Sequence, residues 1–262
     1  LDWRVPIREQ FDWLIRHEPQ YLLTQPSNLR ALIQHSRESG AVPRGLSQVS
    51  TLSEIVEPAL RDDCAQAWGA TICDVYSCEE LGMVAIQCPD HPHYHVQSES
   101  VFVEILNERG ETCAPGETGR VVATDLHNFA MPLIRYETGD YAQVGAACPC
   151  GRGLPVLSRV MGRQRNMLTL PSGDTMWPSY HAGLFLSVAP VRQIQLIQHS
   201  LEEIEVKLVV AEPTTADQEE RLRANLAESF GHPFRFRFTY VDEIPTGPGG
   251  KFEDFVSKLP NG

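Results

Sequence analysis

The chain has 262 residues, 42% of them hydrophobic, which is enough apolar surface for one large core or two smaller ones. Its 34 acidic and 22 basic side chains give a formal net charge of -12, which would repel a phosphate backbone and argues against a nucleic-acid partner. There is no apolar run of about 18 residues, and the first residues resemble neither a secretory signal nor a membrane anchor. We therefore expect a cytoplasmic protein with no membrane partner.

The first part of the chain alternates helical and strand-like patterns. Apolar residues between positions 6 and 17 fall on one helical face, and a second helix begins at Ser27 and ends before Gly40. A third helix is predicted between Pro58 and Gly69, because proline suits the first helical turn and glycine the position after the last. A strand-like run over residues 70–76 follows. This alternation predicts an α/β layer.

The middle of the chain reads as β-strands and the end as a separate unit. Residues 101–106 and 119–124 are strand-like, with a turn at 107–110. Beyond residue 162 the patterns predict a helix and four further elements, over 179–187, 191–198, 203–210, 215–230 and 234–241. That αββαβ order is a compact α+β unit of about 100 residues, long enough to be its own domain. We place the boundary between residues 161 and 162, which gives domains 1–161 and 162–262.

Six short motifs stand in a fixed order along the chain. They are DVYSCEELG (74–82), GETGR (116–120), MPLIRYETGD (131–140), CPCGR (148–152), GR (162–163) and IPTGPGGKF (244–252). In this order they resemble the adenylate-forming ligases, and the IRY and CPCG forms resemble the phenylacetate-coenzyme A ligase branch. The resemblance implies the C-terminal part of a large α/β AMP-binding domain with a β-rich subdomain, followed by a small mobile α+β domain.

The resemblance also implies a two-step reaction. A carboxylic acid, in this branch an aromatic one, would react with ATP and Mg2+ to give an acyl-adenylate, and the thiol of coenzyme A would then displace AMP. A second interpretation keeps the first step and passes the acyl group to a carrier-protein thiol or to an amine. A third, of a different class, is a catalytically silent binding or assembly module. The sequence leaves the oligomeric state open.

The nucleotide motifs assign roles to particular side chains by resemblance. Tyr76 would stack on adenine, Glu80 would help to hold Mg2+, and Asp140 would accept hydrogen bonds from both ribose hydroxyls. Without the motifs, the same residues would read as a core tyrosine, one carboxylate among many and a turn-forming aspartate. The family has Gly and Thr where this chain has Ser77 and Glu79. We therefore expect the contacts of this loop with the ATP phosphates to differ from those in the family.

Three cations are assigned in the same way. Lys251 would be the catalytic cation, because an ammonium between the attacking carboxylate and the α-phosphate stabilises the charge brought together there. Arg163 would reach the ribose or phosphates, and Arg165 stands at the family's pivot between half-reactions. The alternative is a surface lysine in a glycine loop and two solvated arginines.

The seven cysteines are an odd number in a long chain, which favours reduced thiols or a metal site over a disulfide scaffold. Cys88, His95, Cys148 and Cys150 offer three thiolates and one imidazole, the ligand set of a structural zinc site. His91 and His93 compete with His95, which we prefer because its setting resembles the branch. The alternative is unligated buried cysteines.

The phosphate-binding loop of the family, rich in Ser, Thr and Gly, would lie upstream of all these motifs, and it has no counterpart in this sequence. We therefore expect the sequence to start inside the large domain and, taken alone, to bind ATP poorly and to be inactive.

Overall fold

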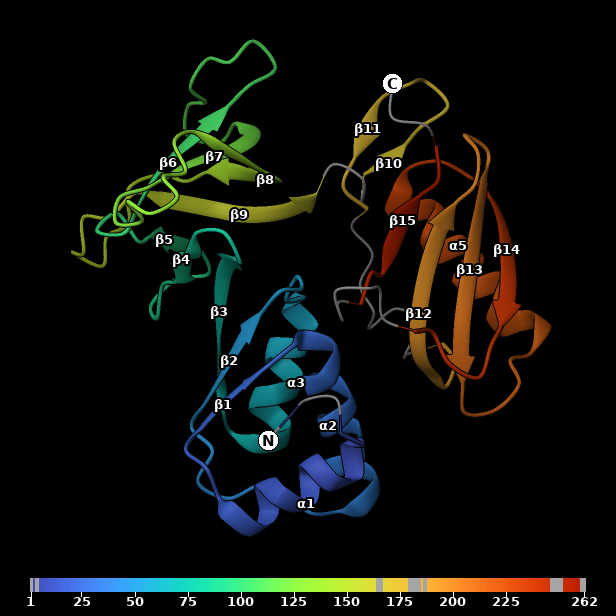
Figure 1. The fold of residues 1–262 in the computed structure, drawn as a ribbon. Coiled ribbons are helices and arrows are strands. Elements are labelled where there is room, and N and C mark those ends of the chain that lie inside the picture. Colours follow the sequence, from blue (N-terminus) through green and yellow to red (C-terminus); the bar gives the residue numbers. More distant parts are fainter. Residues whose placement is uncertain are drawn as a thin grey trace. The chain divides into compact units, whose positions relative to one another are not determined.

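The structure is a computed structural model that describes residues 2, 5–163, 167–178, 185, 188–245 and 252–259. The chain divides into two compact units, Leu1–Arg163 and Gln164–Gly262 (Figure 1). None of the helices within the described ranges has the length and apolar composition needed to cross a bilayer.

Unit 1 begins with helices and parallel strands and continues as antiparallel strands. Its elements are α1 (Ile7–His17), β1 (Tyr21–Thr24), α2 (Pro26–Ser39), β2 (Gln48–Leu52), α3 (Pro58–Trp68), β3 (Thr71–Cys78), β4 (Gly82–Gln87), β5 (Tyr94–Val96), β6 (Val101–Leu106), β7 (Thr118–Asp125), β8 (Tyr136–Val144) and β9 (Val156–Arg163).

The three helices begin and end where the sequence patterns predict. Proline occupies the first turn of α2 and of α3, and Gly40 and Gly69 follow their last residues in the left-handed conformation that glycine adopts without strain. Phe11 and Leu14 of α1 are buried, whereas Ile15, predicted to lie on the same face, is 37% exposed. The buried faces of the helices form one core with β2 and β3.

All nine strands belong to one sheet, in the order β1-β2-β3-β4-β5-β9-β8-β7-β6. β1, β2 and β3 are parallel, and every later pairing is antiparallel. In a flat sheet β3 and β8, four steps apart, would be separated by about 19 Å. Hydrogen bonds nevertheless join their side chains. The sheet must therefore curl strongly between them, and the apolar residues inside the curl form a second core.

The described part of unit 2 has a four-stranded sheet, a separate two-stranded sheet and one helix of several turns. Its described elements are β10 (Leu168–Thr169), β11 (Thr175–Met176), β12 (Val191–Gln198), β13 (Glu203–Val210), α5 (Ala216–Phe230), β14 (Arg235–Tyr240) and β15 (Phe255–Ser257). β12 and β13 have the predicted bounds, and α5 starts after the Thr215 N-cap in a capping box with Gln218. Apart from Phe185, the helix predicted over 179–187 lies outside the described residues.

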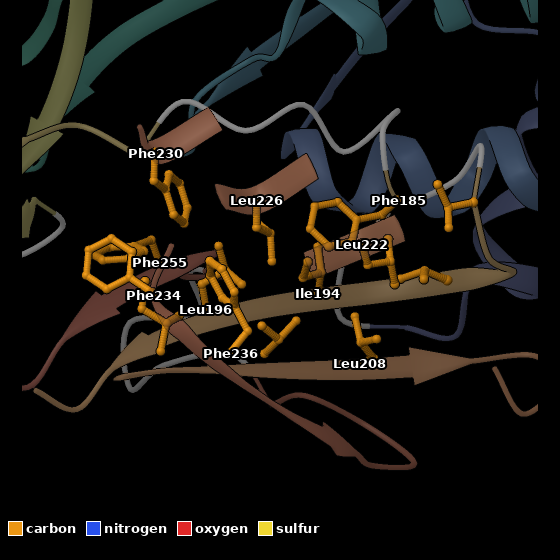
Figure 2. Packing of buried hydrophobic residues seen from close by; sticks show 14 of the residues in the cluster. Phe185, Ile194, Leu196, Leu208, Leu222, Leu226, Phe230, Phe234, Phe236 and Phe255 are labelled. Atoms are coloured by element: carbon orange, nitrogen blue, oxygen red, sulfur yellow. The ribbon is translucent and has the colours of Figure 1, made fainter. Parts of the chain in front are cut away.

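The core of unit 2 lies between α5 and one face of the sheet (Figure 2). Leu222, Leu226 and Phe230 of α5 are at most 1% exposed and pack toward the strands. The sequence patterns did not predict β15, which adds a fourth strand in the order β14-β13-β12-β15. Gln198, fully buried at the end of β12, binds the backbone N–H and C=O of Thr169 through its amide and so connects β10 to the sheet.

Candidate active site

The curl of the sheet in unit 1 brings the end of β3 against β8. Tyr76 lies near the end of β3, and Glu80 lies in the turn that leads to β4. On β8, Tyr136, Thr138 and Asp140 are two residues apart, and the Thr138 hydroxyl and the Asp140 carboxylate both lie within hydrogen-bond distance of the Tyr76 hydroxyl. Two of the six motifs, DVYSCEELG and MPLIRYETGD, therefore meet at one place.

Asp140 is held by groups from both strands. Its Oδ2 accepts a hydrogen bond from the Tyr76 hydroxyl over 2.9 Å, and its backbone N–H donates to the Thr138 hydroxyl over 3.1 Å. Tyr76 is only 8% exposed, and burial and the neighbouring Asp140 carboxylate raise the pKa of its hydroxyl. The tyrosine therefore stays a neutral donor, which suits a carboxylate acceptor.

Glu80 is an exposed carboxylate with a fixed partner. Its Oε1 accepts a hydrogen bond from the Tyr136 hydroxyl over 3.0 Å. A hydrogen bond from its own backbone and the one from Tyr136 lower the pKa of Glu80, and the same bond raises the pKa of Tyr136. At neutral pH Glu80 is therefore an ionised oxygen donor of the kind that Mg2+ binds.

Arg163, the last residue of β9, is paired in register with Asp140. Its Nε lies 3.7 Å from Asp140 Oδ1, and half of the side chain, 50%, is exposed. The guanidinium thus keeps donors directed to solvent beside the carboxylate. An anionic group bound next to Asp140 could pair with them.

Four predicted site residues, Tyr76, Glu80, Asp140 and Arg163, thus lie in one cluster. Arg165 and Lys251 lie outside the described residues. Tyr136 had no assigned role in the sequence analysis. The available signal was the spacing, since Tyr136 precedes Asp140 by four residues just as Tyr76 precedes Glu80.

The side chains of this cluster fit a nucleotide and a hard cation. Asp140 is an acceptor-only group beside a half-exposed guanidinium, a pairing that suits sugar hydroxyls next to a phosphate. Glu80 adds an exposed, ionised carboxylate. The arrangement can hold a polar anionic ligand beside Asp140 and Arg163.

A second cluster joins the β4–β5 loop to the β8–β9 loop. One donor atom each from Cys88, His93, His95 and Cys148 lies within 4.8 Å of every other. The Cys88 and Cys148 sulfurs are 3.9 Å apart, close to the roughly 3.8 Å between two thiolates on one tetrahedral zinc ion with bonds of about 2.3 Å. Three predicted ligands and one competing histidine are therefore together.

Cys150, the remaining predicted ligand, lies beside this group. Its sulfur is 3.3 Å from His95 Nε2, while the other nitrogen, His95 Nδ1, and also His93 Nε2 are buried with no hydrogen-bond partner in the described part of the chain. A hydrogen bond from the backbone of Arg152 lowers the pKa of Cys150 to about 6. Two unpartnered imidazole nitrogens beside two thiols fit a soft or borderline cation such as Zn2+.

Comparisons with known proteins agree with the motifs. Residues 171–258 match the CapK C-terminal domain family. The phenylacetate-coenzyme A ligase of Thermus thermophilus is 29% identical over 206 residues, which are 74% of this chain and 46% of that protein. The chain therefore spans about half the length of the curated relatives that it matches.

Several solved structures with a similar fold are coenzyme A ligases, and another is the amide bond synthetase McbA from Marinactinospora thermotolerans. A 2-hydroxyisobutyryl-coenzyme A ligase in the postadenylation state, in complex with R3-HIB-AMP, has a TM-score of 0.80 at 20% identity and covers 96% of this chain and 57% of its own. The anthranilate coenzyme A ligase AuaEII in complex with anthranoyl-AMP has a TM-score of 0.74 at 17% identity, covering 96% of this chain and 50% of its own. The predicted fold class is confirmed. The chain accordingly has the fold of part of these ligases, and its sequence relatives include phenylacetate-coenzyme A ligases and Protein CapK of Staphylococcus aureus.

Proposed function

We propose that the full-length protein activates a carboxylic acid with MgATP to an acyl-adenylate and pyrophosphate and then transfers the acyl group to the thiol of coenzyme A. The observation that carries this proposal is the Tyr76–Asp140 hydrogen bond, which joins two of the family motifs at one site. The sequence relatives support the coenzyme A acceptor and an aromatic acid.

The side chains of the cluster would divide the work. Asp140 would accept the ribose hydroxyls alongside the hydrogen bond that its carboxylate accepts from Tyr76, because a carboxylate can accept several hydrogen bonds at once. Arg163 would face the ribose or the phosphates, and Glu80 would hold Mg2+, which neutralises phosphate charge when bound. Tyr76 would contribute its ring to the adenine site. Lys251 would supply the cation for adenylate formation, and Arg165 would be the pivot.

Isotope exchange tests the first step directly. We expect the full-length protein to exchange pyrophosphate into ATP only when a substrate acid is present, with aryl acids above alkyl acids across a panel. An acceptor screen with coenzyme A, a phosphopantetheinyl carrier protein and amines then identifies the second step. Absence of acid-dependent exchange with every acid would leave the silent binding module as the better interpretation.

We also propose a structural zinc site in the cysteine and histidine cluster, with Cys88, His93, His95 and Cys148 as ligands. The support is geometric, because one donor atom of each of the four residues lies within 4.8 Å of every other, and each imidazole has a buried nitrogen, His93 Nε2 or His95 Nδ1, without a hydrogen-bond partner in the described part of the chain. If Nδ1 of His95 binds the metal, its Nε2 carries the proton and donates to the Cys150 sulfur. Cys150 would then orient a ligand from outside the coordination shell, where the sequence motif alone made it a ligand.

A further inference from the structure

The two carboxylates of the candidate active site are held in a reciprocal arrangement. The Tyr76 hydroxyl donates to Asp140, and the Tyr136 hydroxyl donates to Glu80. Each tyrosine precedes the carboxylate of its own motif by four residues, and each donates its hydrogen bond to the carboxylate of the other motif. Two segments that are about 60 residues apart in sequence are thereby tied at two points.

The two ties differ in their surroundings. Asp140 is partly buried, with 15% of its side chain exposed, and it has several partners, among them Thr138 and Arg163. Glu80 is exposed and sits in a turn. A long exposed carboxylate has many rotamers, and each hydrogen bond to it removes part of that freedom. The Tyr136 hydroxyl therefore matters more for where the Glu80 oxygens point than the Tyr76 hydroxyl does for Asp140.

We propose that Tyr136 is a positioning residue that holds Glu80 in the orientation needed to bind a divalent cation with the nucleotide. This inference rests on the proposed role of Glu80 and extends it to a residue that the motifs leave unassigned. The hydroxyl donates to Oε1 of a side chain that is exposed to solvent, from which a cation can approach. Carboxylates that bind metals commonly accept hydrogen bonds from neighbouring groups, which fix the orientation of the carboxylate before the metal binds. The Tyr136 hydroxyl would act on Glu80 in the same way.

Alternatives from the rest of the chain do not substitute for this hydroxyl. The other groups that influence the Glu80 carboxylate are its own backbone, Cys78 and Arg163. The thiol of Cys78 is a weak donor and Arg163 acts through its charge. Tyr136 is thus the only strong neutral side-chain donor to Glu80 within the described residues.

Nucleotide binding separates this role from a general one. We would measure the dissociation constants of AMP, of ATP without metal and of ATP with saturating Mg2+ for the full-length protein by titration calorimetry. Tyr136→Phe should leave the dissociation constants of AMP and of metal-free ATP unchanged. It should reduce the tightening, which is the factor by which Mg2+ lowers the dissociation constant of ATP, about tenfold, the lower end of the effects of losing a hydrogen-bond partner of a metal ligand. Glu80→Gln should abolish the tightening. The double variant should equal Glu80→Gln alone, because the tyrosine acts through that carboxylate.

Tyr141→Phe is the matched control. Tyr141 is on the same strand and its hydroxyl also donates to a glutamate, Glu108, over 3.3 Å, but it lies outside the cluster. It should bind MgATP as the wild type does. The inference would be overturned if Mg2+ strengthened ATP binding to Tyr136→Phe as much as to wild type. It would also be overturned if the double variant bound MgATP more weakly than Glu80→Gln alone. Wild-type protein that binds no ATP would instead overturn the proposed function, so the two failures are distinguishable.

Discussion

The Tyr94 hydroxyl of β5 donates a hydrogen bond to the Asp74 carboxylate of β3, 2.5 Å away, across the intervening strand β4. The second oxygen of Asp74 accepts from the Thr51 hydroxyl of β2 over 2.7 Å, and Asp74 is only 6% exposed. One buried carboxylate therefore joins three strands at the point where the sheet changes from parallel to antiparallel pairing. It lies two residues before Tyr76 and supports the strand that carries the candidate nucleotide site.

This carboxylate should make the stability of unit 1 fall as the pH rises. Burial raises the pKa of Asp74 above its ordinary value of 3.8, although hydrogen bonds from Tyr94 and Thr51 oppose the shift. From about pH 4 up to the folded-state pKa, the unfolded chain loses this proton while the folded chain keeps it, so the free energy of unfolding decreases with pH. In Asp74→Asn this contribution is absent. Its melting temperature, relative to wild type, should therefore increase between pH 4 and pH 7.

Asp125→Asn provides a control of opposite sign. Hydrogen bonds from the backbone N–H groups of His127 and Asn128 lower the pKa of Asp125, so its contribution to stability is present above its unfolded pKa and is lost on acidification. The melting temperature of Asp125→Asn relative to wild type should therefore fall as the pH rises from the folded-state pKa of Asp125 to about pH 4, and it should stay level above that. Parallel curves for Asp74→Asn and wild type would contradict the burial argument.

Elemental analysis should find about one zinc ion per chain. Cys88→Ser and His93→Ala each remove a proposed ligand, and both should lose the metal together with part of the thermal stability, because the binding free energy of a structural zinc contributes to folding. Cys150→Ala should keep the metal with an affinity about 10- to 100-fold weaker, as for loss of an outer partner. His91→Ala is the neutral control. If Cys150→Ala contained no zinc while His93→Ala kept a full equivalent, Cys150 and not His93 would be the fourth ligand.

Asp140→Ala should weaken nucleotide binding more than it weakens the fold. The substitution removes the proposed acceptor of two ribose hydroxyls at a side chain outside both cores of unit 1. Hydrogen bonds to a charged group contribute about 1.5–3 kcal/mol each, so we expect at least a tenfold loss of AMP affinity in the full-length protein. A thermal melt checks the fold. Unchanged AMP affinity would remove Asp140 from the nucleotide site.

Lys251→Ala should separate the two half-reactions. If its ammonium stabilises only the transition state of adenylate formation, acid-dependent pyrophosphate exchange should fall by about 10²-fold or more. Conversion of a supplied acyl-adenylate to the thioester should stay near normal. An equal loss in both steps, or in neither, would show that the lysine has another role. Lys207→Ala, which changes a lysine within β13, controls for the loss of charge.

The sequence predicted helices better than the curled sheet. Pro58 and Gly69 mark both ends of α3 because proline and glycine act locally. β15 is only three residues long, and its strand state depends on pairing with β12, which lies about 60 residues earlier. No local sequence pattern predicts pairing with a strand so distant in the sequence. For the same reason β4, β5, β8 and β9 were not predicted.

The candidate site divides in the same way. Tyr76, Glu80, Asp140 and Arg163 were recognisable because each belongs to an ordered motif. The contact between Tyr136 and Glu80 exists only because the sheet curls, and the place of His93 in the cysteine cluster depends on how the loop from Cys88 closes, with Cys88 N–H bound to the His93 carbonyl. The sequence includes the residues that make these contacts, but motif spacing does not predict the geometry that brings them together.

The pairing of β5 with β9 has a consequence for native-state opening. It joins the two parts of the nine-stranded sheet through only two paired positions, Tyr94 with Leu157 and His95 with Val156. Such a short seam should open before the longer ladders on either side, so its amides should exchange with solvent first. The cysteine and histidine cluster includes His95 of this seam, and its other members lie on the loops next to it. Removing metal with a chelator should therefore speed hydrogen exchange at β5 and β9 while α1 and α2 remain protected.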